Sequence, residues 1–129
     1  MIIKLLLVLF FFLNFTSITY SAGNSSNDNN NSKVMSDFDW GERKILKAKK
    51  YEKKGKIKKA EKNYKAAIKF FLKANEDDSV NPDIYNYLGF ANRKTGNFTD
   101  AEMYYLIGLE LDPKHNGINE YLGELYLQT

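Results

Sequence analysis

The side chains that most often do chemistry are scarce in this chain and do not converge. The 129 residues include one histidine, His115, and no cysteine, which excludes thiol catalysis, disulfides and zinc–thiolate sites. A catalytic or metal-binding histidine needs partners that converge on it, and the nearby Asp112 and Glu120 offer at most a weak cation site. We therefore expect a protein that is not an enzyme and that holds no metal or cofactor.

Lysines are the charged residues with the most regular spacing. Five of them step by 4, 3, 4 and 4 residues and so share one face of a helix: Lys58, Lys62, Lys65, Lys69 and Lys73. Such a stripe attracts anionic lipid headgroups or polyanions, or it is a solvated helix face. Nucleic acid is an unlikely partner, because no aromatic side chains alternate with the lysines as a platform for bases.

Charge is distributed unevenly along the chain. Residues 41–81 hold 14 basic and 6 acidic side chains, a net charge of +8, whereas residues 82–129 hold 3 and 7, a net charge of −4. A basic half followed by an acidic half favours head-to-tail stacking of copies or an elongated charged ligand.

The elements that would carry these charges follow a pattern of small and large residues. Residues 82–115 combine small residues, aromatic or aliphatic residues and a closing proline: Tyr85, Leu88, Gly89, Ala101, Tyr105, Gly108 and Pro113. Two antiparallel helices approach closely only where a side chain is nearly absent, which is the role expected of the two glycines and the alanine. This 34-residue unit resembles the tetratricopeptide repeat family, whose repeat is a helix-turn-helix pair.

Weaker copies of the unit lie on either side of it. The copy before it holds Ala48, Tyr51, a turn at Gly55, and then Ala60, Tyr64 and Ala67. Ala60 and Ala101 are 41 residues apart instead of 34, and seven extra residues make two helical turns of about 3.6 residues each. We therefore expect an elongated second helix that ends near residue 75. The copy after it holds a second Leu–Gly pair, Leu122 and Gly123.

The resemblance implies an all-α domain over residues 36–129. It would be a short solenoid of about two repeats, at 41–81 and 82–115, followed by a helix at 116–129. That helix is either a cap or a partial third repeat. Ser36 and Asp39 form a capping-box pattern that would start the first helix, with Phe38 and Trp40 covering it. About three repeats are usually needed to cover every apolar face, so we expect self-association or partner binding to cover the rest.

The first residues are typical of a secretory leader. Residues 1–23 hold Lys4, an apolar run at 5–13 and small residues towards residue 23. The same stretch nearly reaches the roughly 20 residues that span a bilayer, so an N-terminal anchor is also open. The Asn/Ser-rich residues 24–35 would be a disordered linker. We expect an exported protein, periplasmic or secreted, or alternatively one anchored in the inner membrane.

The resemblance also implies a function. Members of the family are binding scaffolds, and partner peptides lie in a concave groove lined by the first helix of each repeat. By register, the groove positions here are Lys49, Glu52, Asn86, Phe90, Arg93, Glu120 and Glu124. The family's clamp for a C-terminal carboxylate uses lysine and asparagine, and here two glutamates would oppose it.

We therefore expect a peptide of basic or mixed charge, contacted partly by stacking on Phe90 and Tyr87. Phe90 could equally pack only against a neighbouring helix. The function expected is that of a small bacterial envelope adaptor that binds a peptide or helix of another protein. The alternative is a self-associating structural subunit.

Overall fold

The computed structural model describes residues 34–129, and this part of the chain is all-α, as expected. The leader expected at residues 1–23 and most of the linker expected at 24–35 lie outside the described residues. The helices are α2 (Asp37–Lys53), α3 (Ile57–Asp77), α4 (Pro82–Lys94), α5 (Phe98–Leu111) and α6 (Asn116–Gln128). None of these five helices is both long enough and apolar enough to cross a membrane.

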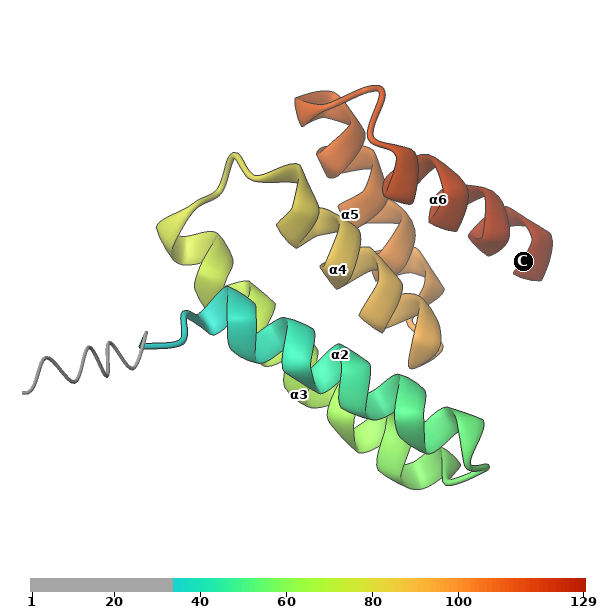
Figure 1. Cartoon of the computed structure of the whole chain (residues 1–129). Coiled ribbons are helices and arrows are strands. Elements are labelled where there is room, and N and C mark those ends of the chain that lie inside the picture. Colours follow the sequence, from blue (N-terminus) through green and yellow to red (C-terminus); the bar gives the residue numbers. More distant parts are fainter. Residues whose placement is uncertain (1–33) are drawn as a thin grey trace, which may run out of the picture. The chain divides into compact units, whose positions relative to one another are not determined.

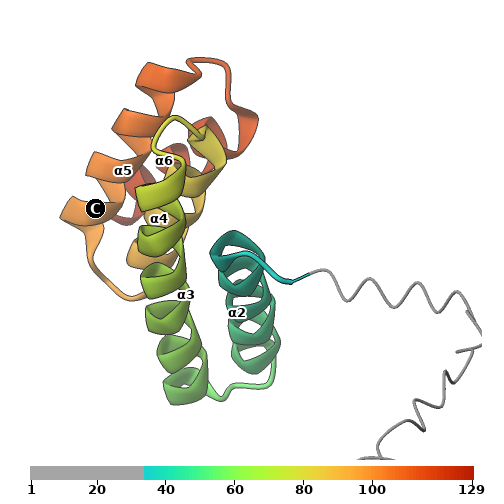
Figure 2. The ribbon, with the colours of Figure 1, turned by 90° about the vertical axis from the view of Figure 1, so that its left-hand side faces the viewer.

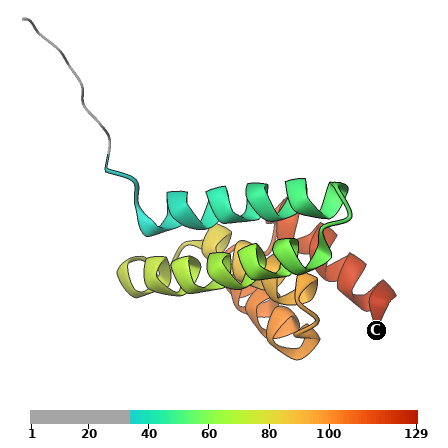
Figure 3. The same ribbon diagram turned by 90° about the horizontal axis from the view of Figure 1, so that it is seen from below.

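The helices form two antiparallel hairpins and a final single helix. In Figure 1 the α2–α3 hairpin, the α4–α5 hairpin and α6 follow one another in chain order. Figures 2 and 3 show α2 and α3 lying side by side along their length. Each hairpin turns at a glycine with a positive φ, 67° at Gly55 and 81° at Gly96. Residues with side chains rarely adopt this conformation, so the two turns depend on glycine.

Helix lengths agree with the extra residues counted in the sequence. Helix α3 has 21 residues and α5 has 14, a difference of seven. The elongated second helix is therefore confirmed, and it ends at Asp77, two residues after the expected position. Helices α4 and α6 both have 13 residues. Helix α2 begins at Asp37, four residues before the expected start of the first unit at residue 41.

The start of α2 is fixed by the capping box that the sequence predicts. The Ser36 side chain accepts a hydrogen bond from the Asp39 N–H at 3.1 Å, and the Asp39 carboxylate accepts one from the Ser36 N–H at 2.9 Å. Phe38 packs edge-on against Phe71, with the ring centroids 5.5 Å apart. Trp40 is 40% exposed and stacks on Phe70 of α3 at 6.2 Å. Phe38 therefore covers the core, whereas Trp40 lies on the surface.

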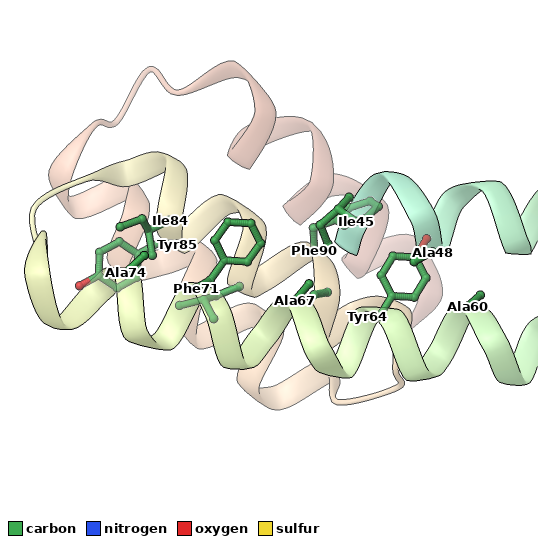
Figure 4. Packing of buried hydrophobic residues seen from close by; sticks show 12 residues of the cluster. Ile45, Ala48, Ala60, Tyr64, Ala67, Phe71, Ala74, Ile84, Tyr85 and Phe90 are labelled. Carbon is green, nitrogen blue, oxygen red and sulfur yellow. The ribbon is translucent and has the colours of Figure 1, made fainter. Parts of the chain in front are cut away.

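The main core follows one stripe of α3. Its buried residues are spaced by 4, 3, 4 and 3 positions and so lie on one face: Ala60, Tyr64, Ala67, Phe71 and Ala74. Figure 4 shows this row of side chains pointing towards residues of α2 and α4. The Phe71 ring stacks on Tyr87 of α4 with centroids 4.8 Å apart and planes 4° apart. This contact joins the first hairpin to the second.

Small residues set how closely the helices approach. A Cβ atom on Gly89 of α4 would overlap the buried ring of Tyr105 in α5, and one on Gly108 would overlap Ile118 of α6. Gly41 has the same role, since a Cβ there would lie 2.7 Å from the Phe71 ring. Gly123 stands 34 residues after Gly89, yet nothing lies within 4 Å of its Cβ position. No described residue therefore covers the equivalent surface of α6.

We predict opposite effects for one substitution at these two equivalent glycines. Gly89→Ala should lower the free energy of unfolding by about 2–3 kcal/mol, because the Tyr105 ring cannot move without overpacking the core. Gly123→Ala should be neutral or should stabilise by up to about 1 kcal/mol, because alanine favours the helix. Urea unfolding of both variants measures this difference. Equal effects at the two positions would contradict the packing described here.

Candidate partner-binding groove

Helices α2, α4 and α6 meet around an open hollow. Its volume is about 310 Å³, and each of the three helices contributes to it. The lining residues are Lys49, Glu52 and Lys53 from α2, Phe90, Arg93 and Lys94 from α4, and Tyr121 and Glu124 from α6. We refer to this hollow as the groove.

Five of the seven groove residues expected from the sequence line this hollow: Lys49, Glu52, Phe90, Arg93 and Glu124. The other two lie elsewhere. Asn86 is half-buried one helical turn before Phe90 in α4, where its side chain lies beside Gly117. Glu120 is exposed on α6 outside the hollow. Asn86 and Glu120 therefore do not line the same hollow as Phe90.

Three further residues line the groove without having been expected there. Lys53 and Lys94 follow Glu52 and Arg93 directly and are 41 residues apart, the same offset that relates Gly55 to Gly96. The register of the two hairpins could therefore have identified both lysines. Tyr121 was not among the residues that the sequence placed in the groove. It lies on the groove side of α6 because it packs against Phe90.

Phe90 forms the floor of the groove and is only 4% exposed. Its ring lies 5.9 Å from that of Tyr64 and 5.0 Å from that of Tyr121, so residues from both neighbouring units enclose it. The Lys49 ammonium lies 4.7 Å from the ring centroid, over its face. The packing interpretation of Phe90 is therefore the one that the structure shows, and a ligand could not stack on its face while Lys49 stays in place.

Tyr87, unlike Phe90, does not line the groove. Its ring stacks on Phe71, and its hydroxyl donates a hydrogen bond to the Glu42 carboxylate at 2.7 Å. Burial and this hydrogen bond both raise the pKa of Tyr87, so it stays a neutral donor. The Tyr87 ring therefore belongs to the contact between the first two hairpins and does not line the groove.

Both carboxylates of the groove are paired with cations of the groove. Arg93 Nη2 lies 2.6 Å from Glu124, and Arg93 Nη1 donates to Gln128 at 3.2 Å. Lys94 Nζ donates to Glu52 at 2.8 Å. These pairs join α4 to α6 on one side and to α2 on the other.

Glu52 also accepts a hydrogen bond from the Tyr64 hydroxyl at 2.9 Å. Burial by itself would raise the pKa of Glu52, but the hydrogen bonds from Lys94 and Tyr64 and the nearby positive charges lower it below its ordinary value. The Glu52 carboxylate therefore stays ionised at neutral pH. Its contribution to stability is present above the ordinary carboxyl pKa and is lost as the pH falls through the lowered value.

The groove carries a net positive charge. Its lining includes four cations and two carboxylates, and each carboxylate is paired with an arginine or a lysine. Lys49 and Lys53 form no ion pair with any other residue that the structure describes. The sequence argument for a ligand of basic or mixed charge relied on two glutamates in the groove. In the structure Glu120 lies outside the groove and Glu124 is paired with Arg93.

His115 has a structural role that its sequence position did not reveal. Its Nδ1 accepts a hydrogen bond from the Ile118 N–H at 3.1 Å and so caps the start of α6. Its Nε2 lies 2.9 Å from the Asp83 carboxylate of α4. In the neutral ring Nε2 then carries the proton and donates to Asp83. The histidine therefore fixes how α6 starts beside α4.

All five residues of the lysine stripe on α3 are exposed. Lys65 pairs with Glu61 at 2.6 Å, one helical turn away. Four of the five line a shallow hollow of about 430 Å³ on the outer side of α3, away from the groove. The stripe and the groove are thus separate surfaces.

We predict that the two glutamates of α6 differ sharply in their effect on stability. Arg93 has a side chain only 4% exposed. Removing Glu124 would therefore leave a buried guanidinium without its counter-charge. Glu124→Ala should lower the free energy of unfolding by about 2 kcal/mol, since Glu124 itself is half-exposed. Glu120→Ala, the matched control one turn earlier, should change it by less than about 0.5 kcal/mol. Urea titration of both variants would contradict the buried pair if they lost equal stability.

No protein-family model matches this sequence, and no curated protein matches it either.

Proposed function

We propose that this protein is a non-catalytic binding scaffold of the tetratricopeptide repeat type, which holds a segment of a partner protein in the groove. The groove itself carries the proposal. Three successive units contribute side chains to one hollow, from equivalent helices α2, α4 and α6. A scaffold of this kind binds by presenting a preformed surface, and the hydrogen bonds and ion pairs among the lining residues hold this surface in place.

The equivalence of the units supports the assignment to repeats. Tyr64 and Tyr105 are 41 residues apart and are both fully buried aromatic residues of a second helix. The turn glycines Gly55 and Gly96 have the same offset and the same backbone conformation. Leu88 and Leu122 are 34 residues apart and are both buried on a first helix. These pairs are what a chain built from copies of one helical hairpin requires.

An acidic partner segment fits the groove best. Lys49 and Lys53 are the groove cations that lack an ion pair with another described residue. They lie one helical turn apart on α2. The apolar floor is covered by cations, so a ligand meets positive charge first. Electrostatic complementarity of this kind raises the association rate and selects among partners. We therefore propose an acidic segment in place of the peptide of basic or mixed charge expected from the sequence.

We further propose that the partner belongs to the bacterial cell envelope. This placement depends on the leader expected at residues 1–23, which lies outside the described residues. N-terminal sequencing of the protein from cell fractions tests it: a cleaved chain that begins near residue 23 and lies outside the cytoplasm is the expected result.

A random-peptide selection tests the groove directly. We expect the peptides that bind the purified protein to be enriched in aspartate and glutamate. Their affinity should fall at least roughly tenfold in the double variant Lys49→Glu with Lys53→Glu, because the variant reverses the charge of the two groove lysines that form no ion pair. Fluorescence anisotropy measures the affinities. The matched control is Lys50→Glu with Lys54→Glu, which makes the same charge change at exposed positions that do not line the groove.

The proposal fails if the selected peptides are not acidic, or if both double variants weaken binding equally. The second result would show that binding follows the net charge of the α2–α3 hairpin and not the groove. Circular dichroism and thermal unfolding of each variant check that the fold is intact. Lys50, Lys53 and Lys54 are exposed, whereas Lys49 is half-buried above the Phe90 ring.

A further inference from the structure

The two ends of the row of helices carry opposite charge. At the first end, α2 and α3 border a hollow of about 390 Å³ on the side of the hairpin away from α4. Four lysines surround it, Lys44 and Lys47 from α2 and Lys59 and Lys62 from α3, and no acidic residue lines it. None of the four forms an ion pair with another described residue. We call this surface the basic end face.

The basic end face also has apolar surface. Tyr51 and Ala66 line the hollow together with the lysines. The stacked pair of Trp40 and Phe70 continues the same side of the hairpin, because Trp40 and Lys44 are one helical turn apart. A hollow with an apolar lining and a ring of cations suits an apolar side chain that is flanked by carboxylates.

The opposite end presents that combination. Glu120, Gly123 and Leu127 lie on one strip of α6, because they are spaced by three and four residues. Leu127 is 90% exposed, and nothing lies within 4 Å of the Cβ position of Gly123. Tyr126 is also exposed and donates a hydrogen bond to Glu102 of α5 at 2.8 Å, which joins the two helices into one surface. We call this surface the acidic end face.

The apolar part of the acidic end face extends onto α5. Leu106 follows Glu102 by one turn and is 46% exposed. In the α4–α5 hairpin the position that corresponds to Gly123 is Gly89, which is covered by the ring of Tyr105. At Gly123, as at Gly89, the missing side chain would let a second helix pack closely. No described helix covers this surface of α6.

We propose that the basic end face of one copy docks onto the acidic end face of a second copy, so that the chain assembles head to tail. Charge complementarity selects a second copy as the occupant. Each end face would repel a copy of itself, whereas the two different ends attract each other and both bury apolar surface. Such a heterologous contact leaves a free face at each end of the assembly, so it continues into longer chains unless it closes into a ring. The proposal does not depend on the groove, since no groove residue belongs to either end face.

Two variants remove one end face each without touching the core. Lys47→Glu with Lys62→Glu reverses two charges of the basic end face at exposed positions. Gly123→Arg places a long cation on the acidic end face, where the described part of the chain leaves open space. A control with the same charge change as the first variant is Lys58→Glu with Lys69→Glu, at two exposed positions of α3 that do not line the hollow between α2 and α3.

Sedimentation velocity of the purified protein at low salt tests the proposal. For the unaltered protein and the Lys58/Lys69 control, we expect the average mass to rise over roughly a hundredfold range of concentration. Association should weaken at least roughly tenfold at high salt, since exposed charges are screened. Each end-face variant alone should stay monomeric. An equal mixture of the two should form a dimer and stop there, because one intact face of each kind remains.

The mixing result distinguishes this assembly from any symmetric dimer or unrelated contact. A mixture that stays monomeric, or variants that associate as strongly as the unaltered protein, would overturn the proposal. An unaltered protein that remains monomeric at every concentration at low salt would overturn it as well. Thermal unfolding of both variants at low concentration, with melting temperatures near that of the unaltered protein, shows that the loss of association is not a loss of folding.

Discussion

The burial of one aromatic ring, that of Phe90, is the constraint on which the rest of this structure depends. A single helical hairpin has one apolar stripe and cannot cover it alone. Phe90 projects from the second hairpin, and its ring is enclosed by Tyr64 of the first hairpin and Tyr121 of the last helix. Because the ring contacts residues on both sides, the three units cannot slide past one another without exposing it. The position of the groove follows from this contact.

The charges around Phe90 belong to the same arrangement. Lys49, Arg93 and Lys94 all lie within 6 Å of its ring centroid, where the ring face attracts cations. Arg93 and Lys94 are also held by carboxylates of α6 and α2. The aromatic floor therefore concentrates positive charge above itself, and only part of that charge is neutralised. This is the physical reason for our proposal that the partner segment is acidic.

The sequence predicted the helices and their close contacts better than the burial and ion pairs of individual groove residues. Seven extra residues make two helical turns, and α3 is indeed seven residues longer than α5. Gly89 and Gly108 could be recognised because their neighbours in the pattern are large, and both lie at close helix contacts. Gly41 was not recognised as a contact residue, since the turn of α3 that packs on it belongs to the extra length.

The groove residues were harder to predict because spacing gives the face of a helix and not what covers that face. Phe90 is on the concave side, yet neighbouring units on both sides bury it. The register placed Glu124 correctly, but the ion pair with Arg93 that neutralises it depends on how closely α6 approaches α4. Gly108 of α5, which packs closely against Ile118 of α6, helps to position α6, and both residues lie outside the groove. Spacing likewise could not show that Gly123 is open, because it does not reveal that no described helix packs against this glycine.

The most direct test of this account is a nuclear Overhauser spectrum of the protein with selectively labelled phenylalanine and tyrosine. The account predicts cross-peaks from the Phe90 ring to both the Tyr64 and the Tyr121 rings, whose centroids lie 5.9 Å and 5.0 Å away. Cross-peaks to only one of these tyrosines, or to neither, would contradict it. They would mean that the three units do not meet at Phe90 and that the groove between α2, α4 and α6 does not form.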